Sequence, residues 1–591
     1  MSFDQLFLFG LLAALFAMLI WGRWRYDLVA FAALVVALVA GVVPKDQAFT
    51  GFGHPATIVI ALVLVIGRGL SASGAIEVVT RKLVDASRGV SAHIGIMAGL
   101  AAALSAVMNN VGALALLMPV DIQAAVKARR SPALTLMPLS FATILGGLVT
   151  LIGTPPNVII AAYREKAIGE PFSMFDFTPV GAACAIAGVA FVATVGWRLI
   201  PAATVSRNPG RELADIEDFV AEVRVPEASK SIGRKVRDLD GVAEENDVAV
   251  LGLVRRGRRL AGMARTQEIR KGDILLIEAA PRNIEQFVGA LGLDYVGSEK
   301  TAGMLGDNLA LAEVVVPETA RIVGRSAISM NLLSRFAVTV LGVSRAGKRS
   351  LERVRSQDVR AGDILLLLGP EEQLPDVIAW LGCLPIAERS HQVIQRDKAG
   401  LAAGLFAAAI ALASTGVLHL PVALAACAVL MVAFRIIPLG QIYDTIEWPV
   451  IVLLGSLIPI GAALESTGGT ALIADGIVTL SQGYSPVVVL TLLVVVTMTL
   501  SDVLNNTATT VIAGPIAIDL AARLGVNPDP FLMGVAIAAS CAFLTPIGHK
   551  NNTLVMGPGG YGFGDYWRMG LPLEVIVVVV AIPTILWVWP L

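Results

Sequence analysis

Paired asparagines interrupt two apolar stretches of this chain, at 109–110 and again at 505–506. Further along each half, a glycine and an asparagine interrupt a second apolar stretch, at 153–157 and at 548–552. An Asn side chain offers an acceptor oxygen and two N–H donors, so such breaks could bind a cation and an anion side by side without a permanent charge. Polar breaks at matching positions of two apolar halves are typical of the substrate site of a secondary transporter.

The two asparagine pairs are predicted to lie at the tips of helical hairpins. A hairpin tip at membrane depth exposes backbone groups that lipid cannot satisfy, and it is tolerated only where it lines a cavity or is buried in protein. Helix N-termini at such a tip present N–H groups to an anion, and helix C-termini present carbonyl groups to a cation such as Na⁺. The alternative is that these Asn side chains only cap the hairpin turns.

The second pair of breaks is expected to face the hairpin tips and to complete two binding sites. The residues that we expect to bind the anion are Asn110, Asn506, Thr507, Thr545, Pro546 and Lys550. The residues that we expect to hold Na⁺ are Asn109, Asn110, Gly153, Thr154, Asn157, Asn505, Asn506, Gly548 and Asn552. The alternative for the breaks is a proline and glycine kink that is kept for packing.

Ionisable residues near the second break have two interpretations each. A lysine within a transmembrane break is costly, so Lys550 could contact the anion or replace a second Na⁺, or it could snorkel or pair with a nearby acid. His549 could titrate in the physiological range or be a hydrogen-bonded structural residue. Asp502 could pair with Lys550 or contribute to a cation site.

The composition places the chain among polytopic membrane proteins. Of its 591 residues 56% are hydrophobic and 15% are charged, and the mean hydropathy is +0.75. A net charge of -1 gives no bulk attraction to nucleic acid, and no enzyme constellation is visible. The first apolar segment, from Leu6, lacks a basic leading region and is expected to be a retained helix. Four cysteines lack metal-ligand spacing and are expected to be packing residues: Cys184, Cys383, Cys427 and Cys541.

The elements that position the breaks are predicted to be two copies of one all-α unit. Pro55 and Gly67 match Pro449 and Gly461 at nearly the same offset as the Asn pairs. In the first half, crossings are expected at about 5–22, 27–43, 55–73, 133–162 and 178–200, with a re-entrant hairpin at about 91–127. In the second half, they are expected at about 399–416, 420–436, 448–466, 530–556 and 571–590, with a hairpin at about 486–523.

An odd number of crossings turns the second half upside down, so the halves are expected to be inverted repeats. Basic residues gather on one side of the predicted first half, and that side should be cytoplasmic. These residues are Arg23, Arg25, Arg81, Lys82, Arg88, Lys127, Arg129, Arg130, Arg198 and Arg207. We therefore expect a multi-pass protein of the cell inner (plasma) membrane, with both termini outside.

A charged insert separates the two halves, and it too is repetitive. Gly272-Asp273 and Gly362-Asp363 open matching apolar segments, which together with short alternating stretches predict two small α+β modules in tandem. We therefore expect a first transmembrane repeat at 1–205, modules at 206–300 and 301–397 in the cytoplasm, and a second repeat at 398–591. The insert lacks a G-x-G-x-x-G before a helix, so a Rossmann domain is not indicated.

These motifs make the membrane halves similar to the divalent-anion:sodium symporter family of the ion transporter superfamily. That family carries a Ser-Asn-Thr motif at each hairpin tip and a Gly-Thr/Ser-Pro-Pro-Asn-like break in the following helix. The chain departs from it at Asn109 and Asn505, which replace Ser, at Val111, which replaces Thr, and at His549 and Lys550. The insert modules resemble the TrkA C-terminal (RCK-C) regulatory domain by their Val-Pro-Glu start and Ala/Lys-Gly-Asp-Ile-Leu end.

The resemblance implies Na⁺-coupled uptake of a small divalent anion by an elevator movement in a homodimer. Sulfate is the leading substrate that it implies, with a C4-dicarboxylate or an organosulfonate of the taurine type as alternatives. A Na⁺/H⁺ antiporter of the same superfamily would need membrane-embedded carboxylates, and only Asp502 is a strong candidate. The modules would be regulatory, through a small-molecule ligand or dimer contacts. A ligand-sensing membrane protein would leave the breaks in both halves unexplained.

Overall fold

The computed structural model describes residues 2–21, 24–73, 89–128, 130–205, 398–437, 442–480 except 444, and 484–591, with most of 220–297 and 309–385. Its contacts divide the chain into two units. The membrane unit contains Met1–Ala202, His391–Asn552 and Gly562–Leu591, and the insert unit contains Ala203–Ser390 and Thr553–Tyr561. Among the basic residues used for orientation, six lie outside the described residues: Arg23, Arg81, Lys82, Arg88, Arg129 and Arg207.

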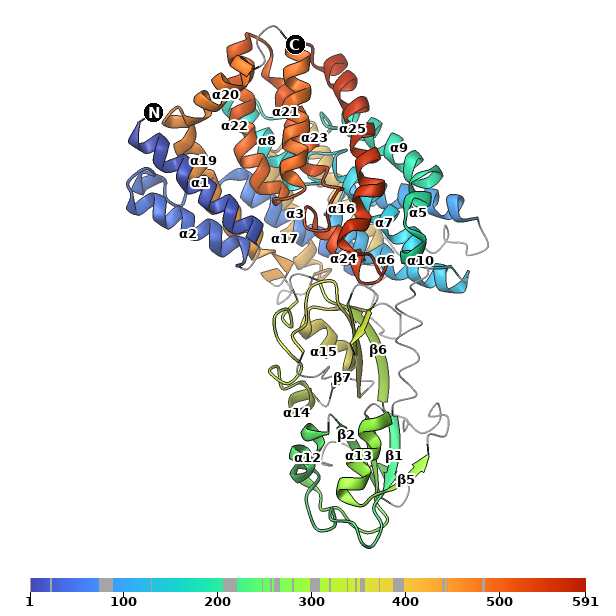
Figure 1. Ribbon diagram of the computed structural model, residues 1–591. Coiled ribbons are helices and arrows are strands. Elements are labelled where there is room, and N and C mark those ends of the chain that lie inside the picture. The colour runs from blue at the N-terminus through green and yellow to red at the C-terminus, as the bar shows by residue number, and fades with distance from the viewer. Residues whose placement is uncertain are drawn as a thin grey trace. The chain divides into compact units, whose positions relative to one another are not determined.

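The first half of the membrane unit is helical, and Figure 1 shows it in blue to green. Its helices are α1 (Phe3–Trp21), α2 (Tyr26–Val39), α3 (Pro55–Ala72), α5 (Val90–Ser105), α6 (Asn110–Lys127), α7 (Ala133–Gly147), α8 (Pro155–Ile168) and α9 (Thr178–Thr194). Prolines begin α3 and α8, because the fixed φ suits the first turn and the missing N–H needs no partner there. A glycine in the left-handed region, Gly169, ends α8.

The second half follows the same order of hairpin and broken helix. Its helices are α16 (Ala399–Ser414), α17 (Leu420–Ala433), α19 (Trp448–Ser466), α20 (Gly469–Leu480), α21 (Pro486–Ser501), α22 (Asn506–Leu524), α23 (Pro528–Ser540), α24 (Lys550–Met556) and α25 (Tyr566–Val588). The predicted hairpins correspond to α5–α6 and α21–α22. The crossings predicted at 133–162 and 530–556 are each two helices, separated by non-helical residues 148–154 and 541–549. The helix α20 was not predicted.

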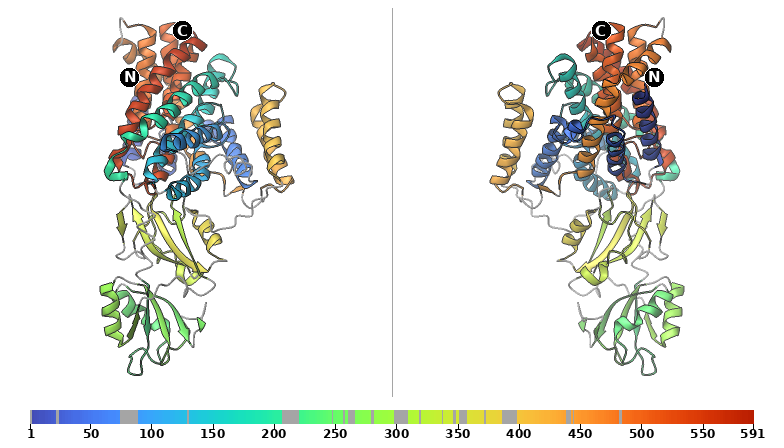
Figure 2. Two further views of the ribbon diagram at one scale, coloured as in Figure 1. Left: turned by 90° about the vertical axis from the view of Figure 1, so that its right-hand side faces the viewer. Right: turned by 90° about the vertical axis from the view of Figure 1, so that its left-hand side faces the viewer.

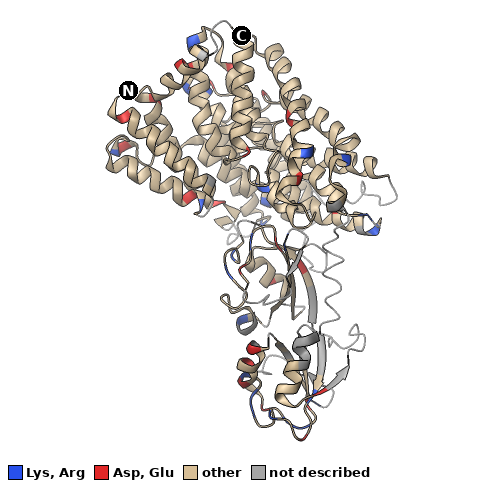
Figure 3. Cartoon of the chain, in the orientation of Figure 1, with Lys and Arg blue, Asp and Glu red and all other residues tan. Residues whose placement is uncertain are grey.

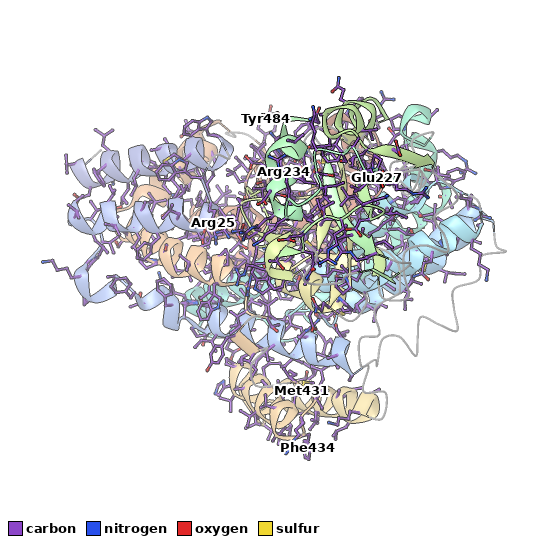
Figure 4. All side chains as sticks on the ribbon, turned by 90° about the horizontal axis from the view of Figure 1, so that it is seen from below. Arg25, Glu227, Arg234, Met431, Phe434 and Tyr484 are labelled. Carbon is purple, nitrogen blue, oxygen red and sulfur yellow. The ribbon has the colours of Figure 1, made fainter. Side chains whose placement is uncertain are left out.

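Helices of the first half pack against helices of the second half. The α2 helix packs on α19, α9 packs on α25, and α8 packs on α22 and α23. The α16–α17 hairpin, visible at the side of the bundle in Figure 2, packs on α3. Met431 of α17 is buried there against Gly69, where an added Cβ would lie 2.7 Å from the Met431 sulfur. Phe434, labelled with Met431 in Figure 4, is 49% exposed.

The helices of the membrane unit have the composition of membrane spans. Charged residues, blue and red in Figure 3, are sparse along them. Among the described residues, four helical stretches are long and apolar enough to cross a membrane: Lys45–Ala72, Trp448–Ser466, Asn506–Leu524 and Phe563–Val588. The other apolar helices have 10–17 residues. Such short helices are expected where a crossing is broken or a hairpin turns back inside the membrane.

In its described residues, the insert unit contains two five-stranded antiparallel sheets with the same strand order. The first joins β3 (Arg258–Arg259), β2 (Ala249–Arg255), β4 (Ile274–Glu278), β1 (Val220–Arg224) and β5 (Asp294–Gly297) in that order. The second joins β8 (Lys348–Ser350), β7 (Thr339–Arg345), β9 (Ile364–Pro370), β6 (Leu309–Val315) and β10 (Leu384–Pro385). Each sheet shifts register just before Gly252 or Gly342, and each has its own apolar core.

Among the described residues, each module has one longer helix and an ion pair to a buried aspartate at the start of its central strand. The helices are α13 (Pro281–Leu291) and α15 (Leu374–Leu381). The Arg255 guanidinium donates to both carboxylate oxygens of Asp273, at 2.8 and 2.7 Å, and Arg345 binds Asp363 at the same distances. The predicted repeat of the Gly-Asp motif therefore corresponds to a repeated turn that a bidentate arginine holds.

Candidate functional site

The second hairpin tip is capped by its own asparagines. Asn505 precedes α22, and its Oδ1 accepts a hydrogen bond from Thr507 N at 2.9 Å. Asn506 Oδ1 accepts from the same N–H at 2.8 Å, and Thr507 is buried. These bonds satisfy an N–H at the helix start that has no partner within the helix. Capping is therefore real at this tip, and it does not use the amide nitrogens of either Asn side chain.

The first hairpin tip combines a cap with a buried amide. Asn109 Oδ1 accepts from Val111 N at 3.1 Å, as Asn505 does in the second half. Asn110 is 3% exposed, and its Oδ1 accepts from Ser105 Oγ at 2.7 Å. An added Cβ at Gly147 would overlap Asn110 Oδ1, so only glycine lets α7 approach the tip this closely.

The asparagines of the two breaks make equivalent bonds, residue for residue. Asn157 Nδ2 donates to the carbonyl oxygens of Gly147 and Thr150, at 3.3 and 2.8 Å. Asn552 Nδ2 donates to the carbonyl oxygens of Ala542 and Thr545, at 3.0 and 3.1 Å. Each acceptor in the second half lies 395 positions after its counterpart, as do the asparagines themselves (552 - 157 = 395). One side chain therefore holds each break open in the same way.

Each break is also fastened to the hairpin of its own half. Thr150 Oγ1 donates to the Ala106 carbonyl at 2.5 Å, and Thr545 Oγ1 donates to the Asp502 carbonyl at 2.6 Å. An added Cβ at Gly548 would lie 2.9 Å from Asp502 Cα, so this glycine permits close contact. The Oγ1 of Thr545 also accepts from Gly548 N at 3.1 Å. Tip and break are thus joined in both halves.

The second break reaches across to the first half. Asn551 Nδ2 donates to the Asn110 carbonyl at 3.1 Å and to Thr143 Oγ1 at 2.6 Å. Asn552 Oδ1 accepts from Ser140 Oγ of α7 at 2.9 Å. These side chains are buried. The two halves therefore share one polar cluster, which contains the first tip, the second break and one face of α7.

His549 belongs to this cluster and bridges Asn551 to Asn110. Its Nδ1 accepts from Asn551 N at 3.2 Å, and its Nε2 lies 3.3 Å from the Asn110 amide. Because a backbone N–H can only donate, Nδ1 carries no proton and neutral His549 is protonated at Nε2. The structure supports the interpretation of His549 as a hydrogen-bonded structural residue.

Among the described residues, no donor is found for several buried oxygens around the breaks. They are Thr154 Oγ1, Asn157 Oδ1 and Asn551 Oδ1, on residues that are at most 1% exposed. Buried acceptors without a donor are uncommon and call for an explanation, such as a bound ion or water. Neutral oxygen atoms are suitable ligands for a hard cation. An added Cβ at Gly153 would overlap the Gly147 carbonyl, so the backbone carrying Thr154 is closely packed.

Lys550 forms an ion pair with an acid outside this polar cluster. Its Nζ forms an ion pair with Glu447, which directly precedes α19, and lies 5.9 Å from the centre of the Tyr26 ring. The two charged side chains are 21% and 20% exposed. The alternative that Lys550 pairs with a nearby acid is thus what the structure displays, and the acid is Glu447 rather than Asp502. For Pro546, the geometry shows a buried position within the second break.

Asp502 lies at the second tip beside a carboxyl group that sequence analysis missed. Its Oδ1 accepts from Leu544 N at 2.8 Å, and Glu574 Oε1 of α25 accepts from Phe543 N at 3.4 Å. Adjacent backbone amides of the break therefore bind the two acids, whose carboxyl groups interact. Both acids are buried, at 2% and 7% exposure.

Ser105, Ser140, Thr143 and Asn551 of the cluster were not among the predicted site residues, and neither was Glu574 beside the second tip. Asn551 lay inside the quoted break. Glu574 is an acid in an apolar helix, a signal that by itself indicates a functional or paired residue. Ser140 and Thr143 gave a weaker signal, because isolated hydroxyl residues often bond to the backbone of their own helix.

Helix N-termini contribute positive potential at the tips and breaks. The helices α6, α8 and α22 begin at Asn110, Pro155 and Asn506, so each starts at a polar interruption. Together with the amide nitrogens of the Asn side chains, these ends favour an anion. The carbonyl ends of α5, α7 and α21 lie at the same interruptions and favour a cation. The arrangement therefore places partial charges of both signs at the tips and breaks.

Comparison with known proteins points to one class. A family model described as Citrate transporter (CitMHS) matches residues 16–511 and 482–590. The chain is similar to an uncharacterized transporter of Synechocystis (31% identity over 93% of this chain and 92% of that protein) and to a putative sulfur deprivation response regulator of Chlamydomonas reinhardtii (27%; 94% and 97%). Sodium/sulfate cotransporter 1 of the same alga is 24% identical over 57% of this chain and 40% of its own length. The solved structure of a YdaH transporter from Alcanivorax borkumensis aligns over 94% of this chain and 88% of its own chain. The sequence identity is 15% and the TM-score is 0.42.

Proposed function

Because the chain belongs to the citrate transporter (CitMHS) family, we propose that it is a secondary active transporter that imports a small divalent anion, sulfate first, together with Na⁺. The observation that carries this proposal is the shared cluster of Asn110, Asn551 and Asn552, in which two hairpin-and-break halves meet. Alternating-access transporters bind their substrates at such junctions.

The local chemistry supports a compact anion. The three helix starts at 110, 155 and 506 and the Asn amide groups supply N–H donors, while Lys550 is occupied by Glu447. A site with donors and partial charges suits a dianion that carries several acceptor oxygens. Sulfate has this form, and relatives that match this chain are named sodium/sulfate cotransporters. A C4-dicarboxylate, a taurine-type sulfonate and, from the family description, citrate are the competing substrates.

The acceptor oxygens support Na⁺ coupling. Thr154 Oγ1, Asn157 Oδ1 and Asn551 Oδ1 are buried and have no donor in the part of the chain that the structure describes, and a Na⁺ ion could be coordinated by such oxygens together with carbonyl groups of the breaks. These atoms belong to both halves, so binding of the cation would strengthen the contact between them. The alternative, Na⁺/H⁺ antiport, gains one specific observation, the buried pair Asp502 and Glu574.

The repeated bonds of the breaks support an inverted-repeat transport domain that moves as an elevator. In this proposal the hairpins α5–α6 and α21–α22, the broken helices and the cluster move together. The helices α1, α2, α3, α16, α17 and α19 form a scaffold that makes the homodimer. Large apolar residues exposed on α17, such as Val422 and Val429 at 55% and 66%, suit contact with lipid or with a second scaffold.

We further propose that the insert lies in the cytoplasm of an inner-membrane protein whose two termini are outside. The shared strand order of its two sheets, and the repeated Arg–Asp turn, support two tandem modules of the RCK-C kind. Such modules would respond to a small-molecule ligand or form contacts in a dimer. Their effect on transport would then be regulatory, since the binding cluster contains residues of the membrane unit alone.

The test is uptake of radiolabelled sulfate, succinate, citrate and taurine into proteoliposomes, with and without an inward Na⁺ gradient. We expect gradient-driven uptake of sulfate, which Asn506→Ala abolishes. Asn246→Ala, which removes a side-chain bond to Val242 within the insert, is the matched control and should retain uptake. Uptake of another anion would correct the substrate. No gradient-driven uptake of any of the four anions would contradict the proposed function.

A further inference from the structure

The two breaks make equivalent asparagine bonds but contain different residues at the start of the helix that follows. The offset of 395 that relates Asn157 to Asn552 also relates Thr154 to His549 (549 - 154 = 395). Thr154 directly precedes α8, and His549 directly precedes α24. A cation site that uses these positions is therefore expected to differ between the two halves.

Two side-chain oxygens at the start of α8 are buried and have no hydrogen-bond partner in the described part of the chain. They are Thr154 Oγ1 and Asn157 Oδ1, on residues that are at most 1% exposed. Thr154 makes no capping bond to α8, although threonine favours such a bond in this position. Buried polar atoms without a partner call for a bound ion or water, and neutral oxygens suit a hard cation.

Gly147 connects these oxygens to the first hairpin tip. Its carbonyl accepts from Asn157 Nδ2 at 3.3 Å, and an added Cβ on it would overlap Asn110 Oδ1. Asn551 donates its Nδ2 to the Asn110 carbonyl at 3.1 Å, and its Oδ1 has no donor among the described residues. The oxygens without donors therefore belong to residues that are linked through one tip and one glycine.

The helix start at the first break has fewer N–H groups that would repel a cation. Pro155 and Pro156 occupy the first two positions of α8, and proline has no backbone N–H. Lys550 and Asn551 occupy the first two positions of α24, and each has one. Because free N–H groups at a helix start create positive potential, a cation is repelled less at the first break than at the second.

At the second break, the corresponding acceptors already have donors. His549 Nδ1 accepts from Asn551 N at 3.2 Å, so the ring proton lies on Nε2 and the ring presents an N–H there. Asn552 Oδ1 accepts from Ser140 Oγ at 2.9 Å, whereas Asn157 Oδ1 has no donor in the described residues. Neither His549 nor Asn552 therefore offers Na⁺ the acceptor that its counterpart offers.

The same difference is present in the helices that precede the breaks. Ser140 of α7 supplies the hydroxyl that binds Asn552, and the residue 395 positions later, in α23, is Val535 (535 - 140 = 395). Val535 is buried and has no polar side-chain atom, and its helix packs on α8. The position that supplies a donor to the second break therefore supplies none to the first.

We propose that only the first of the two duplicated breaks binds Na⁺ and that His549 and Ser140 exclude cations from the second. The proposal rests on the Na⁺-coupled transport proposed above, and it gives the chain one Na⁺ site although the duplication predicts two. Thr154, Asn157 and Asn551 would hold the ion. Asn552, which the sequence suggested as a Na⁺ ligand, would instead shape the second break and join it to α7.

Two further buried oxygens of the second half have no donor among the described residues. They are Asp502 Oδ2, at the second tip, and Ser540 Oγ, directly before the second break. Their counterparts in the first half are Ala106 and Leu145, which have no polar side-chain atom (502 - 106 = 396; 540 - 145 = 395). A Na⁺ ion bound there would be additional to the one at the first break, so the number of ions bound per chain distinguishes the two cases.

The first test is equilibrium binding of radioactive Na⁺ to the purified protein in detergent, which does not depend on transport. We expect one ion per chain at saturation. Thr154→Val removes the hydroxyl at nearly constant size and should lower the affinity about tenfold. Thr470→Val is the matched control, because Thr470 of α20 is also a buried threonine whose hydroxyl has no partner in the described chain, and it should leave binding unchanged.

Two ions per chain, or an unchanged affinity in Thr154→Val, would overturn the proposal. If two ions bind, loss of one in Asp502→Asn would place the additional ion at the second tip. Na⁺ binding by a protein that takes up none of the four anions would contradict the proposed transport and leave the single site standing. A protein that binds no Na⁺ would contradict both the site and the coupling.

The second test gives the second break the residues of the first. Ser140→Val combined with His549→Thr places at both positions the residue types found at their counterparts, Val535 and Thr154. A folded double variant, identified by a cooperative thermal transition, should bind a second Na⁺ ion, because Asn552 Oδ1 loses its donor and a hydroxyl replaces the imidazole. Binding of a single ion by this variant would show that His549 and Ser140 are not what excludes a cation, and would overturn that part of the proposal.

Discussion

Ser140 and Asn552 lie 412 positions apart in the chain, and the Ser140 hydroxyl donates to Asn552 Oδ1 at 2.9 Å. The amide nitrogen of the same Asn552 holds the second break by two carbonyl bonds. One side chain therefore shapes its own half and also joins it to the other half. Any movement that separates α7 from the second break must release this bond.

Ser140→Ala should destabilise the protein and slow uptake. The change leaves a buried amide oxygen without its donor, which costs about 1–3 kcal/mol. Ser71→Ala is the control, because Ser71 donates to Gly67 within its own helix. We expect a lower melting temperature and a reduced maximal uptake rate for Ser140→Ala only. Equal behaviour of the two variants would show that the bond between the halves carries no special role.

Asn157→Ala should weaken Na⁺ binding. Its Oδ1 has no donor among the residues that the structure describes, whereas its Nδ2 holds the first break. If this ligand contributes about 1.4 kcal/mol to the free energy of Na⁺ binding, its loss would raise the Na⁺ concentration for half-maximal uptake about tenfold. Asn527→Ala, which removes the cap of α23, is the control and should not change it. An unchanged Na⁺ dependence in Asn157→Ala would remove this residue from the cation site.

Gly153→Ala should abolish uptake, and Gly99→Ala should not. A Cβ at 153 would overlap the Gly147 carbonyl, whereas a Cβ at 99, within α5, meets nothing within 4 Å. In a helix interior, alanine is more favourable than glycine by roughly 0.5–1 kcal/mol, so Gly99→Ala should if anything stabilise the protein. Uptake and melting temperature of both variants check this. Active Gly153→Ala protein would show that the break tolerates widening.

Lys550→Met distinguishes a structural from a binding role of this lysine. If Lys550 only pairs with Glu447, the KM for the anion should stay within about twofold, since the interaction lost is a partly buried ion pair. Thermal stability should fall. Lys166→Met breaks the more exposed pair with Glu465 and should leave both quantities nearly unchanged. A large increase in KM for Lys550→Met would instead support the interpretation that Lys550 contacts the anion.

The insert should lose stability as the pH rises from about 4.5 to about 7. Burial raises the pKa of Glu313, on β6, from 4.5 to about 7, so the folded state keeps a proton that the unfolded chain releases. The contribution is greatest below pH 4.5, and the loss reaches about 3 kcal/mol above pH 7. Hydrogen exchange of β6 amides, corrected for intrinsic rates, should show this in the wild type and not in Glu313→Gln. A pH response shared by both proteins would place its cause elsewhere.

Much of the helical framework could be predicted from sequence, because the lengths of the apolar runs indicate where helices lie. Apolar runs, helix-starting prolines and paired asparagines predicted two hairpins. In the structure, the second helix of each hairpin starts at Asn110 or Asn506. The breaks were foreseen because glycine and asparagine stand where an apolar helix should continue. Periodicity did not predict α20, whose short apolar run resembles the end of the preceding crossing.

The contacts between halves could not be predicted, because they depend on tertiary packing. Nothing in the local sequence pairs Ser140 with Asn552, or directs Lys550 to Glu447 rather than to Asp502. Glu574 shows the same limit, since an isolated acid in an apolar helix indicates a partner without naming it. The sodium ligands, the elevator movement and the inverted orientation of the halves stay predictions for the experiments above.

The crossed bonds of Asn110, Asn551 and Asn552 have a consequence for how the chain could be divided. If each half were made as a separate polypeptide, Asn551 would lose its carbonyl acceptor and Asn552 its hydroxyl donor, both supplied by the other half. Neither fragment would then be self-sufficient, and co-production of the two should rescue folding where either alone is degraded. Because each fragment would depend on the other, the growth of cells could then be used to select for the presence of both.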